Sequence, residues 1–200
     1  MPACRRKERL SLVDEWDNST VMVRVFVALE LSGEIRSRLA EAQDTLRTCS
    51  ARLTFVNPDL IHITAKFLGE VNAQQLPAIR EALRSIPFRP FAISAGEVTV
   101  NNRERPRTVW SSIEDAGNGQ QLLLAIDTAL GPLDIEPETR RFTPHATVAR
   151  VKVADPSLFI ALRKLEGKTY GSCQVSSLKL KKSTLTPGGP VYEDLLEVKW

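Results

Sequence analysis

Apolar and polar positions recur along the chain with two different periods, and together they predict both strands and helices. Runs of strand type, rich in β-branched and aromatic residues, fall at 21–31, 53–68, 91–100, 108–114, 140–151, 173–182 and 191–200. Apolar residues return at helical spacing in four other segments, which begin near Ser32, Asn72, Gly119 and Asp155. Helices and strands thus alternate along the chain, which favours an α+β fold.

Three of the four expected helices begin with a side chain that can accept a hydrogen bond from a free backbone amide. These N-cap residues are Ser32, Asn72 and Asp155, and Pro156 suits the first position of the last helix. We expect helices to start at these residues and the last helix to end at Gly167.

The order of the expected elements occurs twice. Each half has a helix, a strand with a histidine, a second helix and a pair of strands. Each half also has one His-x-Thr phrase, HITAKFLGEV at 62–71 and HATVARV at 145–151, and these phrases contain the only two histidines of the chain. This duplication predicts two pseudo-symmetric lobes of antiparallel sheet, with flanking helices, around a central cleft.

The two phrases place matched functional groups on one side of each strand. Because residues i and i+2 of a strand face the same way, His62 projects with Thr64, and His145 projects with Thr147. Imidazole has a reference pKa near 6.5, so a pair can supply a general base and a general acid. Threonine hydroxyls can donate hydrogen bonds to phosphate oxygens. This set suits a reactive phosphodiester, of which a strained cyclic phosphate is the natural example.

The sequence gives little support to metal or cofactor chemistry. Two histidines without a neighbouring carboxylate or thiolate provide two ligands, fewer than a usual metal site needs. The chain has no Walker loop, no dinucleotide fingerprint and no G-x-S-x-G motif. We therefore expect neither a metal nor a cofactor.

The composition of the chain indicates the class of protein and the cellular compartment to which it belongs. An apolar fraction of 42% supplies a core, and no apolar run is long enough to cross a membrane. The three cysteines are widely spaced, which favours a reducing compartment over a disulfide framework. Because the net charge is only +3, the basic cluster of Arg103, Arg105 and Arg107 is interpreted first as solvated surface. We expect a cytoplasmic monomer that does not contact a membrane.

Residues 1–20 differ from the rest of the chain. They are polar, mixed in charge and without periodicity, which predicts a poorly ordered tail before a single bilobal domain at 21–200. They also lack the apolar stretch of a secretory signal. Met22 stands at the start of the first strand, so translation from Met22 is a further hypothesis.

Five motifs, in their order along the chain, resemble those of a known family. They are RVFVALELS, HITAKFLGEV, RPRTVW, RRFTPHATVARVK and STLTPGGPVY. Paired H-x-T phrases on a duplicated α+β framework mark the 2H phosphoesterases, and the chain is most similar to the RNA 2′,3′-cyclic phosphodiesterases, also called the 2′-5′ RNA ligase family. The resemblance covers residues 22–200. It implies metal-independent hydrolysis of RNA 2′,3′-cyclic phosphate ends to 2′-phosphomonoesters, and 2′-5′ ligation of tRNA halves as a second activity.

The resemblance also implies roles for four residues. His62 corresponds to the proton donor to the leaving oxygen, and His145 corresponds to the proton acceptor that activates water. Thr64 and Thr147 correspond to the hydroxyls that hold the phosphate. Because the two phrases are nearly symmetric, the residues themselves leave open which histidine is the acid and which the base.

Three further residues are expected to bind substrate: Lys66, Phe67 and Arg150. Phe67 and Arg150 stand five positions after the two histidines, where the family often has Phe and Arg. Strict alternation places such residues opposite the histidine, so Arg150 reaches the cleft only if its strand bulges or ends nearby. The same alternation makes Lys66 face the cleft, and for Phe67 core packing is the alternative.

Two other functions stay open from the sequence. One is an RNA-end-binding or tRNA-processing accessory protein that holds a phosphate without turnover. The other is a phosphodiesterase that acts on a small cyclic nucleotide. Catalysis is favoured because both histidines are present, whereas holding a phosphate needs only hydrogen-bond donors.

Overall fold

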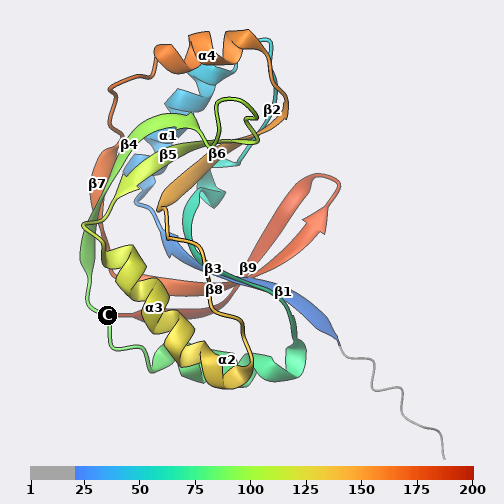
Figure 1. The fold of residues 1–200 in the computed structure, drawn as a ribbon, viewed down its shortest axis with the longest axis vertical. Coiled ribbons are helices and arrows are strands. Elements are labelled where there is room, and N and C mark those ends of the chain that lie inside the picture. Colours follow the sequence, from blue (N-terminus) through green and yellow to red (C-terminus); the bar gives the residue numbers. More distant parts are fainter. Residues whose placement is uncertain (1–20) are drawn as a thin grey trace, which may run out of the picture.

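The computed structural model describes residues 21–200, which form one curved sheet with helices packed on its outer side (Figure 1). The predicted tail at residues 1–20 lies outside the described residues. The strands are β1 (Met22–Glu30), β2 (Arg52–Phe55), β3 (His62–Asn72), β4 (Phe91–Val100), β5 (Thr108–Glu114), β6 (His145–Val153), β7 (Gly171–Val175), β8 (Ser177–Thr186) and β9 (Gly189–Lys199). The α-helices are α1 (Gly33–Leu46), α2 (Leu76–Arg84), α3 (Asn118–Leu130) and α4 (Pro156–Arg163).

The sheet consists of two antiparallel halves that meet at the two histidine strands. Its strand order within the described residues is β7-β4-β5-β6-β3-β1-β8-β9, and β2 pairs with β6 outside this path. β3 and β6 pair only at Ile63 and Ala146, after which β2 takes the place of β3 beside β6 from Ala149 onward. The two histidine strands therefore diverge just beyond their H-x-T phrases. This arrangement confirms the predicted α+β fold with two pseudo-symmetric lobes.

Each half of the chain contributes two strands and a helix to the other lobe: β2, β4 and α1 come from the first half, and β8, β9 and α3 come from the second. After α2, the chain enters β4, which pairs with β5; after α4 and β7, it returns to β8, which pairs with β1. The helices cross over in the same way, because α1 packs against β6, β7 and α4, whereas α3 packs against β3 and α2. The apolar faces of both lobes consequently belong to one cluster of buried side chains.

The helix starts follow the predicted capping residues in two cases. Ser32 accepts a hydrogen bond from the amide of Ile35, and Asp155 accepts one from the amide of Ser157. Asn72 instead caps a 3₁₀ turn at Ala73–Gln75, and α2 begins only after it. The difference has a local cause in Pro77, which has no amide hydrogen to donate to the carbonyl of Ala73, so an α-helical turn cannot begin there.

Three predicted strands are shorter or more divided than expected. The segment 53–68 is interrupted by a 3₁₀ turn at Pro58–Leu60, where Pro58 lacks the amide hydrogen that a sheet position would use. Residues 140–144 precede β6 rather than belonging to it. The segment 173–182 is divided at Ser176, because β7 pairs with β4 in one lobe and β8 pairs with β1 in the other.

Within residues 21–200, the structure has no helix that is both long and apolar enough to span a membrane.

Candidate active site

Matching β-bulges shape the two histidine strands. Over their first nine residues, β3 and β6 have the same sequence of buried and accessible positions. In β3 the pairing with β1 skips Ala65, and in β6 the pairing with β5 skips Val148. The buried Gln43 supports the second bulge, since its side-chain amide donates to the carbonyl of Val148 at 2.9 Å. Each bulge adds a residue, so side chains beyond it switch to the other face of the strand.

The register of the two strands brings the four H-x-T side chains together. Ile63 faces Ala146 in an antiparallel pair, which puts His62 opposite Thr147 and Thr64 opposite His145. Both apolar residues of this pair are buried, whereas the histidines and threonines remain partly accessible. The two imidazoles and two hydroxyls therefore lie on the same face, diagonally across the junction of the lobes.

Both imidazoles are held in the same orientation by a backbone carbonyl two residues earlier. His62 Nδ1 lies 2.7 Å from the carbonyl oxygen of Leu60, and His145 Nδ1 lies 2.8 Å from that of Thr143. A carbonyl can only accept, so Nδ1 carries the hydrogen and Nε2 of each neutral ring is an acceptor. The Thr64 hydroxyl, 3.2 Å from His62 Nε2, accordingly donates to it.

The surroundings of the histidines favour their neutral forms. Burial lowers the pKa of His62 to about 4, and the hydrogen bond to Leu60 only partly opposes this; Lys181 and Arg36 lower it further. Burial also lowers the pKa of His145, against the hydrogen bond to Thr143 and together with the charge of Arg150. Both imidazoles are therefore neutral at neutral pH and can accept a proton at Nε2.

Aromatic side chains from neighbouring strands enclose both imidazoles. Phe26 stacks on His62 with ring centroids 5.1 Å apart, and Tyr192 meets His62 edge-on at 5.5 Å. On the other side, Trp110 lies 4.2 Å from His145. These aromatic residues were not identified from the sequence, because their contacts depend on pairings between distant strands. The motifs RVFVALELS, RPRTVW and STLTPGGPVY contain Phe26, Trp110 and Tyr192 respectively, and this was the available signal.

A network of charged side chains lies beside His62. Arg36 donates from Nε to the carbonyl of Ile61 at 3.1 Å and pairs with Glu30. Lys181 lies 2.8 Å from Glu30 and 2.6 Å from Asp194. These contacts fix two cations near the imidazole, where their charge favours a bound anion.

The two bulges decide where the predicted substrate-binding residues lie. The prediction for Lys66 is wrong, whereas the bulge that Arg150 requires is present. Lys66 does not face the cleft, because the bulge at Ala65 turns it into the core, where its side chain is 2% exposed and lies 2.6 Å from Asp127. Phe67 is turned outward and is 62% exposed, with its ring 6.0 Å from that of Phe26. Arg150 is also exposed, since the β6 bulge that it requires is present, and its guanidinium donates to Thr108 at 3.3 Å.

In the described part of the chain, no three His, Cys, Asp or Glu side chains gather in a way that could hold a metal ion. The cleft presents two acceptor imidazoles, two hydroxyls and nearby guanidinium and ammonium groups. It can therefore bind an anion and move protons at two separate positions.

The chain is similar to known phosphoesterases along both of its halves. The model of the LigT like Phosphoesterase family matches residues 29–110 and 115–192, and each of these segments contains one H-x-T phrase. Among curated relatives, the RNA 2′,3′-cyclic phosphodiesterase of Archaeoglobus fulgidus is 34% identical over 174 residues, which are 86% of this chain and 98% of that protein. The enzyme of the same name from Aeropyrum pernix is 36% identical over 166 residues, covering 81% and 94% of the two chains.

Solved structures share the fold. A protein of Thermus thermophilus superposes with a TM-score of 0.72 at 28% identity, over 88% of this chain and 97% of that one. E. coli LigT in complex with 3′-AMP superposes with a TM-score of 0.71 at 22% identity, over 89% and 97% of the two chains. The second likeness shows the common fold alone.

Proposed function

Since the chain belongs to the LigT-like phosphoesterase family, we propose that it hydrolyses terminal 2′,3′-cyclic phosphates of RNA to 2′-phosphomonoesters. The observation that carries this proposal is the paired arrangement of His62 with Thr64 and His145 with Thr147 on one face of two adjoining strands. A cyclic phosphate needs a base for the attacking water, an acid for the leaving oxygen and donors for the non-bridging oxygens.

In this mechanism the two imidazoles act at opposite ends of one displacement. His145 Nε2 accepts a proton from water as the water oxygen bonds to phosphorus. The bond from phosphorus to the 3′-oxygen breaks, and His62 Nε2 gives that oxygen a proton. Thr64 and Thr147 donate hydrogen bonds to the non-bridging oxygens while negative charge builds on them. The assignment of acid and base follows the family.

The low pKa of His62 fits this role once substrate is bound. The phosphodiester carries a negative charge, and an anion beside an imidazole raises its pKa. The proton that the leaving oxygen needs is thus acquired together with the substrate. When His62 Nε2 becomes protonated it can no longer accept from Thr64, so the Thr64 hydroxyl becomes free to donate to the phosphate.

Phe67 and Arg150 are assigned to substrate binding on both sides of the reacting group. The exposed ring of Phe67 offers a stacking surface for the terminal base near His62. Arg150 offers guanidinium donors to the phosphate near His145. The buried Lys66 has no such role.

The proposed enzyme is a single-domain protein of a reducing compartment. We assign residues 21–200 to one bilobal domain, supported by the single cluster of buried side chains. Cys49 and Cys173 are free thiols, which supports a reducing, cytoplasmic location. We further propose a monomer that accepts tRNA halves as substrates and joins them by the same displacement, with the 5′-hydroxyl of one half in place of water and the 3′-oxygen again leaving phosphorus.

The test is to incubate the protein and EDTA with a short RNA that ends in a 2′,3′-cyclic phosphate, and to identify the product. A 2′-phosphate end supports the proposal. A 3′-phosphate end would keep the acid–base pair but reverse the leaving oxygen. Binding without reaction would favour the accessory-protein function, and turnover of cyclic mononucleotides alone would favour a small-molecule phosphodiesterase.

A further inference from the structure

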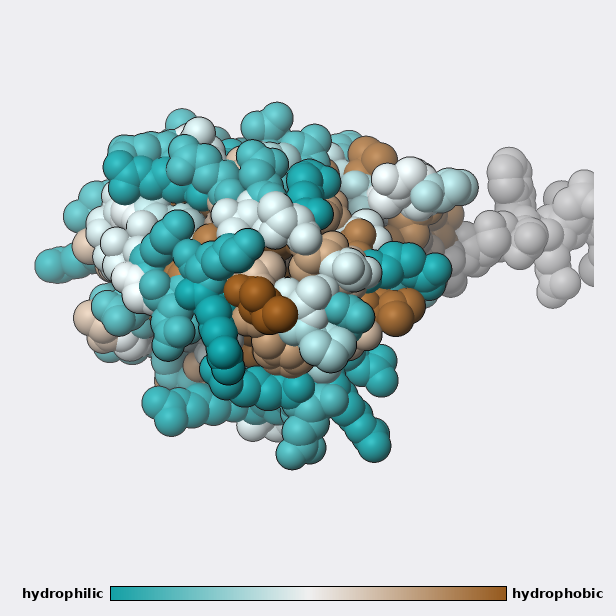
Figure 2. Space-filling model, turned by 90° about the horizontal axis from the view of Figure 1, so that it is seen from above, coloured by the Kyte–Doolittle hydropathy of each residue, from teal (hydrophilic) through white to brown (hydrophobic). Residues whose placement is uncertain are grey.

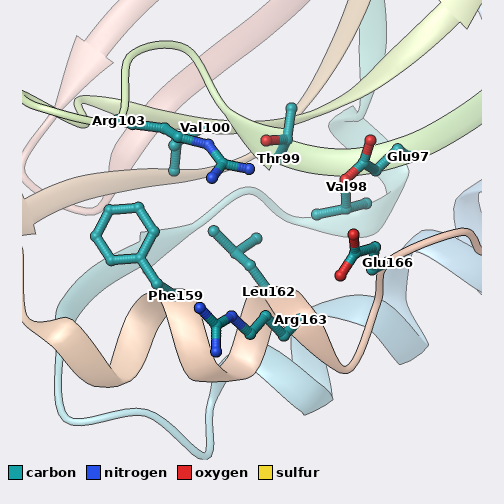
Figure 3. A pocket seen from close by; sticks show the side chains of 9 residues that line it. All are labelled: Glu97, Val98, Thr99, Val100, Arg103, Phe159, Leu162, Arg163 and Glu166. Atoms are coloured by element: carbon teal, nitrogen blue, oxygen red, sulfur yellow. The ribbon is translucent and has the colours of Figure 1, made fainter.

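A groove outside the cleft lies between the edge of β4 and helix α4 (Figure 3). β7 covers β4 only from Phe91 to Ala95, and within residues 21–200 no other strand pairs with the remainder of β4, up to Val100, on that side. The resulting hollow has a volume of about 380 Å³. Its lining residues are Glu97, Val98, Thr99, Val100, Arg103, Phe159, Leu162, Arg163 and Glu166.

The charges in this groove are separated. Figure 3 shows Arg103 and Arg163 directing their guanidinium groups into the space at the end where Phe159 lies, whereas Glu97 and Glu166 lie at the other end. Among residues 21–200, no carboxylate lies within ion-pairing distance of either arginine. Two unpaired cations from different elements that face the same space favour an anion between them.

Four arginines lie along the chain segments between the groove and the second histidine strand. Arg150 donates to Thr108, the first residue of β5, and the carbonyl of Arg107 accepts from the amide of Val151. Arg105 and Arg103 follow in the turn between β4 and β5, and Arg103 reaches the groove. Arg103, Arg105 and Arg107 are exposed, as expected from the sequence, and they lie in the segment that joins the groove strand β4 to β5.

The exposed face around α4 is mostly hydrophilic. Figure 2 views the molecule from the α4 side of Figure 1, and polar residues surround a small hydrophobic patch there. α4 contributes the exposed Ile160, whereas Phe159 and Leu162 of the groove are partly buried against the core. A surface with few exposed apolar side chains and several guanidinium groups suits a polyanion better than an apolar protein segment.

We propose that this groove binds the RNA chain on the 5′ side of the reacting end, with one backbone phosphate held between Arg103 and Arg163. Guanidinium groups can each offer two parallel donors to phosphate oxygens. The ring of Phe159 provides a face on which a base can stack. Glu97 and Glu166 repel a second phosphate but can accept hydrogen bonds from ribose hydroxyls. The inference rests on the proposed function in that the substrate is taken to be RNA.

The experiment compares binding and turnover in two charge-matched double variants. Arg103→Gln/Arg163→Gln removes the groove cations, and Arg84→Gln/Arg89→Gln removes two exposed arginines of the other lobe. Binding is measured over a range of salt concentrations with an RNA of about ten nucleotides that lacks a cyclic end, so that it does not depend on catalysis. Turnover is measured with a cyclic mononucleotide and with the same RNA carrying a cyclic end.

The groove variant should bind the RNA about tenfold more weakly than wild type. Its plot of log affinity against log salt should be shallower by roughly 0.7 for the one phosphate lost. KM for the longer RNA should rise, whereas kcat/KM for the cyclic mononucleotide should stay at the wild-type value. The control variant should lose only the RNA affinity that the removal of two positive charges from the surface causes in general. Its salt slope and its KM for the longer RNA should stay close to the wild-type values.

Equal affinity and equal salt slope in the two double variants would overturn the proposal, and the free edge of β4 would then suit an added peptide strand instead. Failure of the proposed function is a separate result. In that case wild type turns over neither substrate, while the loss of RNA binding in the groove variant can still be measured.

Discussion

Replacement of Lys66 by methionine should destabilise the fold and leave the chemistry intact. The Lys66 side chain is 2% exposed, and its ammonium lies 2.6 Å from Asp127 and 2.7 Å from the carbonyl oxygen of Glu136. Lys66→Met keeps most of the length of the side chain but leaves the carboxylate of Asp127, which is 11% exposed, without its cation. Removal of one partner of a buried ion pair costs about 3–5 kcal/mol in the free energy of unfolding.

Thermal unfolding, followed by circular dichroism, measures this cost. For a chain of this size 1 kcal/mol corresponds to a shift of about 2–4 °C, so Tm should fall by about 6–20 °C. The double variant Lys66→Met/Asp127→Leu is the control, because it removes both charges and leaves no unpaired ion in the core. It should recover most of the lost stability.

The assay of the same variant decides between two roles of Lys66. At a temperature where Lys66→Met is folded, kcat/KM for an RNA with a cyclic end should match the wild type. A variant with an unchanged Tm and a large loss of activity would refute the reasoning, because it would mean that Lys66 contacts the substrate and that the bulge does not turn it into the core.

Three further predictions concern the cleft and its support. His62→Ala and His145→Ala should each abolish turnover, and Thr64→Ala and Thr147→Ala should reduce kcat by smaller factors of roughly 10–1000; full activity in either histidine variant would exclude the two-imidazole mechanism. Because the pKa of His62 is lowered from 6.5 to about 4 in the folded protein, stability should be complete above pH 6.5 and should decline as the pH falls toward 4. This shift in the pKa of His62 corresponds to a loss of about 3 kcal/mol in the free energy of unfolding at pH values below 4. Unfolding in urea at several pH values should therefore show a flatter dependence of this free energy on pH for His62→Asn than for wild type. Gly119→Ala should lower Tm, since the added methyl group meets both Asp115 and Phe142; an unchanged Tm would mean that these side chains move aside at no cost.

The functional groups of the site could be predicted from the sequence because they follow local patterns. The period of two along a strand correctly put each histidine beside its threonine, and the repeated element order indicated two related lobes. The same period failed after the threonines, where it wrongly made Lys66 face the cleft. Aligned on the histidines, Lys66 corresponds to the buried Ala149, and Phe67 corresponds to the exposed Arg150. These pairs match in burial but not in polarity, so the bulge that both strands share became visible only in the structure.

The strand pairings could not be predicted from local patterns. An apolar run reveals that a strand is buried but not which strand lies beside it. Nothing near β8 in the sequence specifies β1 as its partner, which is about 150 residues earlier. For the same reason the aromatic contacts of His62 with Phe26 and Tyr192 were found only in the structure.

The exchange of strands between the two halves determines when the enzyme can become active during its synthesis. β1 leaves the ribosome long before its neighbour β8, which follows it in the chain by about 150 residues. Until then, one edge of β1 is unpaired in the nascent chain, beside a histidine strand that already has His62 and Thr64. Pairing over so large a separation in sequence makes folding slow, and the exposed edge is a site for wrong association in the meantime. The lobe with His62 is therefore completed last, and a chain released early lacks the wall formed by β8 and β9 even though both histidines have been translated.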